Sequence, residues 1–493
     1  MTKVAFIGAG SIGFTRSILT DILAVPELQK IEVSFTDISE HNLDMVTQLC
    51  QRDIDSNGLS IKIQSTLDRR AALTDANYVF NMTRIGGIEG FQTDIEIPLK
   101  YGVDQCVGDT LCAGGIMYGQ RGIAAMLDFC KDIREVGATA CLFLSYGNPN
   151  AMMTWAANVY GKVNTIGLCH GVEGGHQQIA DVLGVPVEEV DIICAGINHQ
   201  TWYIQVKHNG RLVETSELID GFEKHEKFSK TEKVRIDMMK RFGYYSTESN
   251  GHLSEYVPWY RKREDEIMDW ISLDSWINGE TGGYLRVTTE GRNWFEHDFP
   301  NWMKEDPKKY IEESRSKEHG GRIIEALETG RLYRGHFNVV NNGIISNFPD
   351  DAIVEAPGYL DYNGVNMPVV GDLPLGCAAV CNVSIAVQRL AVEAAVNGDD
   401  TLLRQAMMMD PLTGAVCNPP EIWQMVDEML IAQEQWLPQY GKAIVEAKER
   451  MAKGNLISTR ENYKGAAVVK TKSVEEMQHD RDAATKNAQA AEK

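Results

Sequence analysis

A cysteine and several histidines of this chain stand directly after apolar segments, where a metal ion could be bound. Cys169 and His170 follow the apolar run 165–168, and His199 follows a second apolar run further along the chain. A thiolate and an imidazole from neighbouring loops could share a divalent metal and leave coordination positions open for substrate oxygens. A thiol that fills the core and a hydrogen-bonded histidine in a turn also explain these residues. Spacing alone leaves both interpretations open.

A second group of reactive side chains lies in the segment Gly251–Tyr256. His252, Glu255 and Tyr256 are spaced i, i+3 and i+4, which places them on one face of a helix. An imidazole, a carboxylate and a phenol could then reach one pocket. The alternative is an ordinary solvated helix face.

Two further polar residues stand in loops of the same kind. Asn148 begins an Asn-Pro turn after the apolar run 140–144, and α/β sheets bind ligands at the carboxyl ends of their strands. Its amide could bind a sugar hydroxyl or the nicotinamide end of a cofactor, or serve the turn alone. Asp109 lies in the glycine-rich stretch 107–115, whose composition is typical of a flexible loop near a ligand and names no chemistry by itself.

The first thirteen residues contain a dinucleotide-binding fingerprint. Gly8, Gly10 and Gly13 match G-x-G-x-x-G between an apolar run and a stretch with helical spacing. The first glycine permits a tight turn, the second lets the backbone approach a pyrophosphate, and the third lets the helix pack on the strand. The start of that helix, with Ser11 and Ile12, is expected to stabilise the phosphates.

Asp37 completes this fingerprint. It ends the second strand-like run, beyond the glycines. A carboxylate there accepts hydrogen bonds from a ribose 2′-hydroxyl, which favours NAD over NADP.

The elements that must position these residues alternate between strands and helices. Strand-like runs are expected at 3–7, 31–36, 78–82, 140–144, 165–168, 192–195, 202–206, 344–351 and 353–356, with a hairpin turn at 208–210. Residues 222–333 are mostly helical in pattern, and amphipathic helices are expected at 384–397 and 421–433. We therefore predict an α/β protein, with a Rossmann-type doubly wound parallel sheet followed by a mixed α+β substrate domain, as in lactate and malate dehydrogenases.

Composition restricts the class of protein. The 493 residues are 43% hydrophobic and 24% charged, which excludes disorder as the main state. The net charge of −21 disfavours nucleic acid or an anionic membrane surface as a partner. Ten scattered cysteines, no leader pattern at the N-terminus and no apolar run of about 18 residues favour a soluble cytoplasmic protein without a transmembrane helix.

Taken together, these residues resemble family 4 of the glycoside hydrolases, the NAD- and metal-dependent group. The resemblance runs from Val4 to about Tyr440 and includes eight segments: Gly8–Gly13, Arg84–Gly87, Gly108–Thr110, Asn148-Pro149, Cys169-His170, Asn198-His199, Glu255-Tyr256 and Asn342-Gly343 with Asn347. Within the family, the stretch Ser254–Trp259 is similar to the α-galactosidase branch.

The resemblance implies cofactors and a mechanism. Cys169 and His199 would hold a divalent metal, usually Mn²⁺, whose coordination the sugar's 2- and 3-oxygens complete. NAD would take hydride from C3, the metal would polarise the resulting ketone, and a base would remove the C2 proton so that the leaving group departs from C1. Water then adds and the hydride returns, so the net reaction is hydrolysis.

It also implies roles for single residues. Tyr256 matches the proposed base, although a phenol of pKa about 10 needs a nearby cation to act at neutral pH. His170 stands where phospho-sugar members carry an acidic residue, so it would be the acid or a substrate ligand. Arg84 is expected to contact the cofactor, with a substrate carboxylate as its alternative partner. Asn148, Asp109, His252 and Glu255 are expected to bind the substrate.

The same residues narrow the substrate. Cys169-His170 is typical of members that act on unphosphorylated α-glycosides, so we expect an α-galactosidase, with an α-galacturonidase or α-glucosidase as alternatives. An NAD-dependent dehydrogenase of the lactate/malate type and a non-enzymatic NAD sensor are more distant possibilities, because neither uses the cysteine and histidine. Residues 1–195 would bind NAD, residues 196–453 would hold the metal, substrate and interface elements, and residues 454–493 would form a tail or a loosely docked helix. Relatives are commonly homodimers or homotetramers, and we expect the same here.

Overall fold

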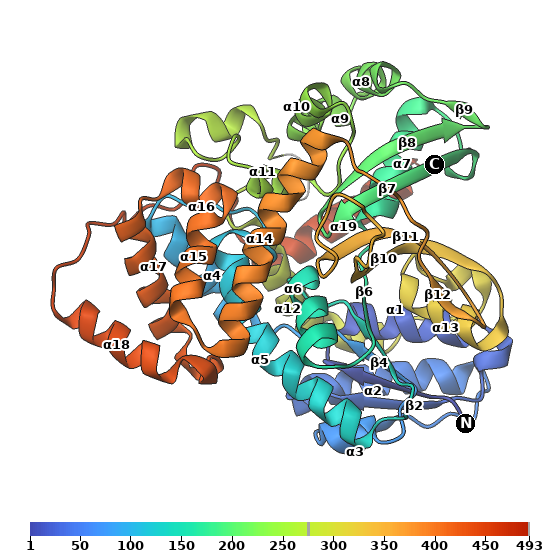
Figure 1. The fold of residues 1–493 in the computed structure, drawn as a ribbon. Helices are drawn as coiled ribbons and strands as arrows, with labels where there is room; N and C mark the ends of the chain where they lie inside the picture. The colour runs from blue at the N-terminus through green and yellow to red at the C-terminus, as the bar shows by residue number, and fades with distance from the viewer. Residues whose placement is uncertain (274–276, 492–493) are drawn as a thin grey trace.

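The computed structural model describes residues 1–273 and 277–491, and one twelve-stranded sheet runs through it (Figure 1). The strand order is β3-β2-β1-β4-β5-β6-β10-β11-β7-β8-β9, and β12 pairs with β11. The first six strands are parallel: β1 Lys3–Ile7, β2 Glu32–Thr36, β3 Gln64–Thr66, β4 Tyr78–Asn81, β5 Leu142–Ser145 and β6 Thr165–Gly167. The others pair antiparallel: β7 Val190–Ile197, β8 Gln200–His208, β9 Arg211–Leu212, β10 Tyr333–Val340, β11 Ile353–Asp361 and β12 Gly364–Asn366.

Helices flank this sheet and form a bundle at one side of the molecule, with α14 to α18 in orange and red (Figure 1). The helices before β7 are α1 Ile12–Leu23, α2 Glu40–Ser56, α3 Arg69–Leu73, α4 Gly87–Lys100, α5 Cys112–Val136, α6 Asn150–Trp155 and α7 Gly171–Leu183. Those between β9 and β10 are α8 Thr215–Lys224, α9 Phe228–Thr231, α10 Lys233–Phe242, α11 Asn250–Tyr256, α12 Gly283–Trp302 and α13 His319–Thr329. The last are α14 Leu375–Asn397, α15 Asp400–Met409, α16 Pro411–Val416, α17 Pro419–Ala432, α18 Gly441–Ala452 and α19 Val474–Ala491.

The parallel half of the sheet is buried on both faces. Alternate residues of a strand point to opposite faces, and β1 shows the result: Phe6 packs with α1, α2 and α13, while Ala5 and Ile7 belong to the core built by α5 and α14. Phe6 also stacks on Phe80, with ring centroids 5.0 Å apart. This arrangement confirms the predicted α/β class.

The two halves of the sheet meet at two short junctions. β6 joins β10 at Gly167 and Asn338, and β7 joins β11 at Gly196 and Glu355. The hairpin β10–β11 is thus inserted between the two strands that precede Cys169 and His199. The domain boundary expected at 195/196 lies inside β7, within a continuous sheet.

One expected strand is absent from the described structure, and one observed strand was not expected. Residues 344–351 form turns, because the buried amide of Asn341 donates to the carbonyls of Ile345, Phe348 and Pro349 and closes the chain on itself. Strand β10, which precedes these turns, was not predicted, whereas the strand expected at 353–356 is the start of β11.

One helix of the C-terminal half departs from the expectations. Helix α14 is long and apolar enough to cross a membrane by length and composition, although no such stretch was expected. Half of its most apolar window is buried within the fold, as in a core helix. The segment expected as a tail or a loosely docked helix carries α19, which packs along α12.

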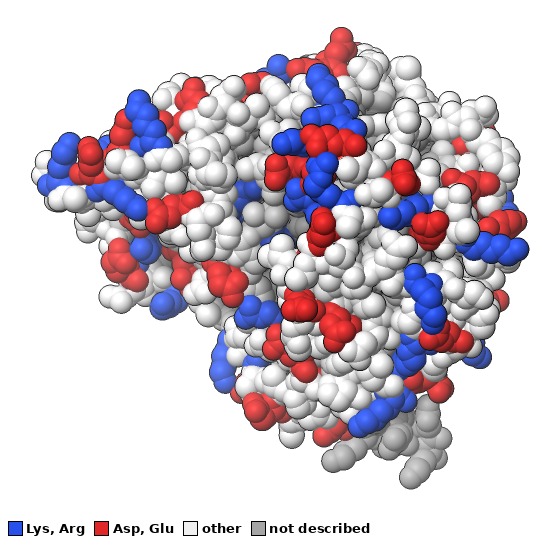
Figure 2. All heavy atoms as spheres, turned by 90° about the horizontal axis from the view of Figure 1, so that it is seen from below, with Lys and Arg blue, Asp and Glu red and all other residues white. Residues whose placement is uncertain are grey.

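Acidic and basic side chains are interspersed over the face drawn in Figure 2. The net charge of −21 is therefore not gathered into a single acidic patch on this face.

A buried ion pair joins three helices of the fold. Arg121 of α5 donates to both oxygens of Asp94 in α4, at 2.8 and 2.7 Å, and also to Gln433, which follows α17. The Arg121 and Asp94 side chains are at most 1% exposed. Water therefore cannot replace either partner.

We expect Arg121→Met to destabilise the protein by about 3–5 kcal/mol, because it leaves the Asp94 carboxylate buried without its partner. Urea unfolding followed by circular dichroism measures this. The control is Arg389→Met, which breaks the exposed pair with Asp351 and should cost less than about 1 kcal/mol. If both substitutions lower the free energy of unfolding equally, the buried ion pair does not have the stabilising role expected here.

Candidate functional site

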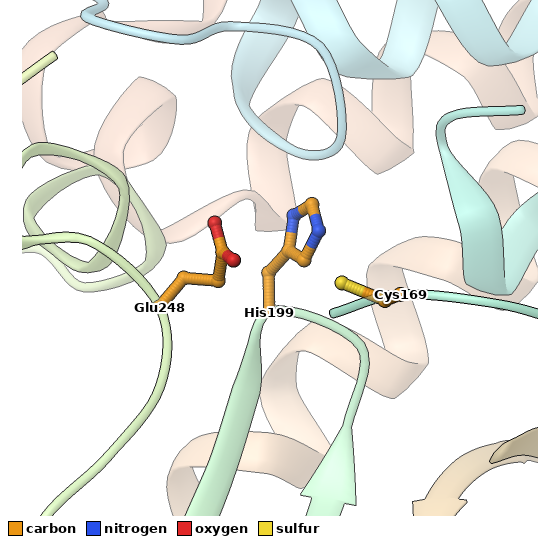
Figure 3. A group of neighbouring side chains, drawn as sticks. All are labelled: Cys169, His199 and Glu248. Atoms are coloured by element: carbon orange, nitrogen blue, oxygen red, sulfur yellow. The ribbon is translucent and has the colours of Figure 1, made fainter. Parts of the chain in front are cut away.

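Three side chains from separate loops converge on one point, as Figure 3 shows. Cys169 follows β6, His199 lies in the turn between β7 and β8, and Glu248 precedes α11. One ligand atom from each (sulfur, ring nitrogen and carboxylate oxygen) lies within 4.8 Å of the other two. Among the described residues this is the one such group of three or more. The structure thus brings together Cys169 and His199 as the sequence predicted, and adds Glu248.

The backbone holds the first two of these side chains in place. His199 has a φ of +63°, a left-handed conformation that costs free energy in a residue other than glycine and is concentrated at functional sites. The Cys169 carbonyl lies 2.9 Å from Nε2 of the buried His319, and the Gly171 N–H points to the Cys169 sulfur at 3.4 Å. Burial raises the pKa of the Cys169 thiol, so a cation is needed to stabilise its thiolate.

Glu248 reaches this point because the neighbouring residue is small. A Cβ atom added to Gly171 would lie 2.6 Å from a carboxylate oxygen of Glu248. Burial opposes ionisation of Glu248, but three neighbouring histidines lower its pKa overall. A side chain at position 171 would therefore displace the Glu248 carboxylate from its present position.

His252 lies beside this group. Its Nε2 is 3.3 Å from Nδ1 of His199 and 2.7 Å from the Thr110 hydroxyl, and its Nδ1 is 3.7 Å from Glu248. Burial and the nearby His199 lower the pKa of His252 to about 3, so it is neutral at physiological pH. The imidazole can therefore act as both donor and acceptor.

Tyr256 lies against His252, with ring centroids 5.3 Å apart. Its hydroxyl is 3.4 Å from the carbonyl of Asn198, next to His199. Burial raises the pKa of this phenol well above its usual value. Tyr256 thus lies close to the cluster in a protonated form.

His170 is placed differently, toward solvent. Its side chain is 60% exposed, and Nδ1 lies 3.3 Å from the Glu318 carboxylate. The hydrogen bond to Glu318 raises the pKa of His170 to about 9. The imidazole is thus next to Cys169 in sequence and carries a proton at neutral pH.

Arg84, Asp109 and Asn148 form a second cluster. The Asp109 carboxylate accepts from Arg84 at 3.2 Å and from the Asn148 amide at 3.1 Å. The Arg84 guanidinium also lies over the rings of Phe91, 4.6 Å away, and Tyr118, 5.2 Å away. Arg84, expected at the cofactor, therefore joins two residues expected at the substrate.

Glu255 has a role that the sequence did not indicate. Its buried carboxylate accepts the backbone N–H groups of Cys106, Val107 and Gly108. Burial raises its pKa to about 7, although these donors and Arg261 oppose the shift. The predicted substrate ligand therefore holds the glycine-rich loop that carries Asp109.

The dinucleotide fingerprint has the expected turn. Gly8 has a φ of +79°, and Asp37 at the end of β2 accepts the N–H of Gly10 at 2.8 Å. A Cβ on Gly10 would lie 2.8 Å from that carboxylate, so this position must be glycine for a close approach.

The structure corrects the expectation that Gly13 allows the helix to pack on the strand. A Cβ there would meet nothing within 4 Å, so the glycine is not required for packing helix against strand. The N-cap Ser11 makes no side-chain hydrogen bond to the first turn of α1, which begins at Ile12. The first N–H groups of α1 and the open space over Gly13 fit a phosphate.

The donor set likewise fits a divalent transition metal. Thiolate, imidazole and carboxylate are all used by such ions, and three protein ligands leave coordination positions for other oxygens. The residues present therefore fit both a dinucleotide and a metal ion.

Comparison with known proteins decides the family. The model described as "Family 4 glycosyl hydrolase" matches residues 3–185, and that of its C-terminal domain matches residues 194–413. The chain belongs to family 4 of the glycosyl hydrolases. An alpha-galactosidase of Rhizobium meliloti is 58% identical to this family 4 enzyme over 98% of both chains. An alpha-galactosidase of Bacillus subtilis is 34% identical over 89% of this chain and 100% of its own.

A solved structure shares the fold of this family 4 enzyme. A 6-phospho-alpha-glucosidase from gut microorganisms, in complex with NAD and glucose-6-phosphate, has a TM-score of 0.74 at 24% identity and covers 89% of this chain and 99% of its own. At that identity the likeness establishes the fold alone.

Sequence reasoning missed Glu248 and Thr110 in this enzyme. Glu248 lies four residues before His252, but it precedes the helix, so no helical spacing indicated it. Thr110 stood in a loop whose composition indicated flexibility without chemistry. Only the folded chain shows that both face His252.

Proposed function

We propose that this family 4 enzyme hydrolyses unphosphorylated α-galactosides with NAD and Mn²⁺. One observation carries the proposal: Cys169, His199 and Glu248 converge at the strand ends of a sheet that begins with a dinucleotide fingerprint. A hydrolase needs both features only when it oxidises its substrate transiently. The 58% identity to an alpha-galactosidase over 98% of both chains supports the galactoside.

The residues present divide the work between them. When bound, NAD would supply a hydride acceptor and the metal a Lewis acid that acidifies a proton beside a sugar ketone. Asp37 and the first turn of α1 would bind the ribose and the phosphates. Cys169, His199 and Glu248 would hold the metal.

Proton transfer is assigned to Tyr256 and His170. Tyr256 would be the base, since its hydroxyl lies 3.4 Å from the carbonyl beside His199 and the positive charge of a metal would favour its deprotonation. His170 would be the acid, because its exposed imidazole lies next to Cys169 and is oriented by Glu318. The neutral His252, buried between Thr110 and His199, would bind substrate hydroxyls.

The cluster around Arg84 supports a neutral sugar. Asp109 already pairs with Arg84, so a uronide carboxylate would have to compete with it. Asn148 and Asp109 offer an amide and a carboxylate, which suit hydroxyl groups. This cluster therefore favours a galactoside over a galacturonide as the substrate. An α-glucoside remains the alternative substrate.

A substrate panel tests the function. p-Nitrophenyl α-galactoside, α-glucoside and α-galacturonide would be incubated with enzyme, NAD⁺, Mn²⁺ and a reductant. We expect the galactoside to be cleaved fastest, and Cys169→Ser to lower kcat/KM more than about 100-fold because a metal ligand is lost. Cleavage that persists without NAD⁺ and metal would contradict the mechanism, and net NADH accumulation would favour a dehydrogenase.

Direct metal titration tests the ligand set. We expect Glu248→Gln to weaken Mn²⁺ binding by at least about 10–100-fold, since even outer partners of a metal site contribute that much. Gly171→Ala should do the same by displacing the carboxylate. Electron paramagnetic resonance of free Mn²⁺ measures the binding without turnover.

Two matched controls accompany this titration. Glu318→Gln removes a nearby charge outside the group of three, and Gly174→Ala adds a methyl group in the same helix where nothing lies within 4 Å. Both should keep their Mn²⁺ affinity. An unchanged affinity in Glu248→Gln would remove it from the ligand set.

The assembly we propose is a homodimer or homotetramer formed through α14. An apolar stripe with helical spacing, Leu375, Ala379, Val383 and Ala386, is exposed along this helix. Light scattering should find an oligomer, and Val383→Glu should dissociate it, whereas the exposed Val445→Glu in α18 should not. A monomeric wild type would exclude this assembly.

We also propose a reducing cytoplasmic compartment, which the ten free cysteines support.

A further inference from the structure

We propose that residues Gly465–Ala467, in the C-terminal segment, position the active-site loop Asp104–Thr110 and thereby control substrate binding. The attachment of the loop to the C-terminal segment is shown by contacts within the chain. Its effect on substrate rests on the function proposed above. The family models match residues up to 413, so this segment lies beyond the part of the chain that they describe.

Backbone hydrogen bonds attach this segment to the body of the protein. The Ala466 N–H donates to the Asp104 carboxylate at 2.9 Å. The Thr281 N–H donates to the Ala467 carbonyl at 2.9 Å, and the Ala467 N–H donates to the Thr281 hydroxyl at 3.3 Å. Ala467 is 2% exposed and packs with Ile267 and Ile271.

The conformation of the segment requires a glycine at position 465, where the backbone passes close to Thr281. Gly465 has a φ of +105°, and a Cβ there would lie 2.3 Å from both Cγ2 and Oγ1 of Thr281. Two other glycines of the region show no such constraint: Gly454 has a φ of +76° but nothing within 4 Å of its Cβ position, and Gly441 likewise has open space. Of these three glycines, only Gly465 therefore lies in close contact with another part of the chain.

Asp104 connects the C-terminal segment to the active-site loop, of which it is the first residue. Its carboxylate is 1% exposed and also accepts from Thr281 Oγ1, at 2.8 Å, and from the buried Arg261. A buried carboxylate is stabilised only when its oxygens have donors. The Ala466 N–H is one of those donors, so undocking the segment destabilises Asp104 in its present position.

The following residues of the loop are held on two sides. Gln105 and Cys106 accept backbone hydrogen bonds from Gly282 and Tyr284 on the side of the C-terminal segment. On the other side, a Cβ on Gly251 of α11 would lie 2.8 Å from the Cys106 sulfur.

Beyond Cys106, the loop enters the active site. Glu255 of α11 binds the N–H groups of residues 106–108. The next two residues are Asp109, which pairs with Arg84, and Thr110, which pairs with His252. A shift of Asp104 would therefore reach both active-site clusters through residues 105–110.

Two pairs of variants test the proposal in the full chain. The first pair is Gly465→Ala against Gly454→Ala, since both place a methyl group at a positive φ and only the first meets Thr281. The second pair is a deletion of 465–493 against a deletion of 474–493, which removes α19 but keeps the docked residues. Hydrogen exchange of residues 104–110 and KM are measured, with amides 32–36 of β2 as an internal reference.

We expect Gly465→Ala and the longer deletion to speed exchange at 106–108 by about tenfold or more, as the loss of a hydrogen bond to a charged group implies. KM for the galactoside should rise several-fold with a smaller change in kcat, while β2 and both controls keep their exchange rates. Unchanged exchange at 106–108 in both variants would overturn the proposal. Faster exchange with an unchanged KM would leave the loop attached as described but overturn its role in substrate binding.

Discussion

One buried carboxylate connects the parts of the active site. Glu255 accepts three successive backbone N–H groups, an arrangement that stabilises negative charge through amide dipoles. It belongs to the helix that carries His252 and Tyr256, and the amides belong to the loop that carries Asp109 and Thr110. Burial raises the pKa of Glu255 to about 7, and the donors and Arg261 offset part of the cost of its charge. These hydrogen bonds therefore tie the position of the helix to that of the loop.

The sequence predicted those features whose chemistry is local. A glycine fingerprint after a strand is read from residue types and spacing, and the structure reproduces the turn at Gly8 and the position of Asp37. Cys169 and His199 were considered as partners because both follow apolar runs and stand in neighbouring loops, and spacing left a second interpretation open. The family resemblance, which the comparisons confirm, added the choice of a metal over a hydrogen-bonded histidine.

The features that could not be predicted depend on burial and on contacts distant in sequence. Helical spacing assigned His252, Glu255 and Tyr256 to one face, but α11 has seven residues and all of them are buried. All three side chains reach the loop Asp104–Thr110 or its neighbours, but their separate contacts inside a fully enclosed helix are not given by spacing: Glu255 binds the amides of residues 106–108, and His252 pairs with Thr110. Glu248 was missed for a related reason, since its place beside Cys169 depends on the missing side chain of Gly171.

The continuous sheet has a consequence for how a sugar enters and leaves. Many enzymes of two domains close by rotation about a hinge, which requires few contacts across the boundary. Here the hairpin β10–β11 is hydrogen-bonded to β6 on one side and to β7 on the other, directly before Cys169 and His199. Rotation at this boundary would separate the very strands that carry the metal ligands. Loops around the site can open without disturbing this pairing, so they are the parts of the chain best suited to admit a substrate.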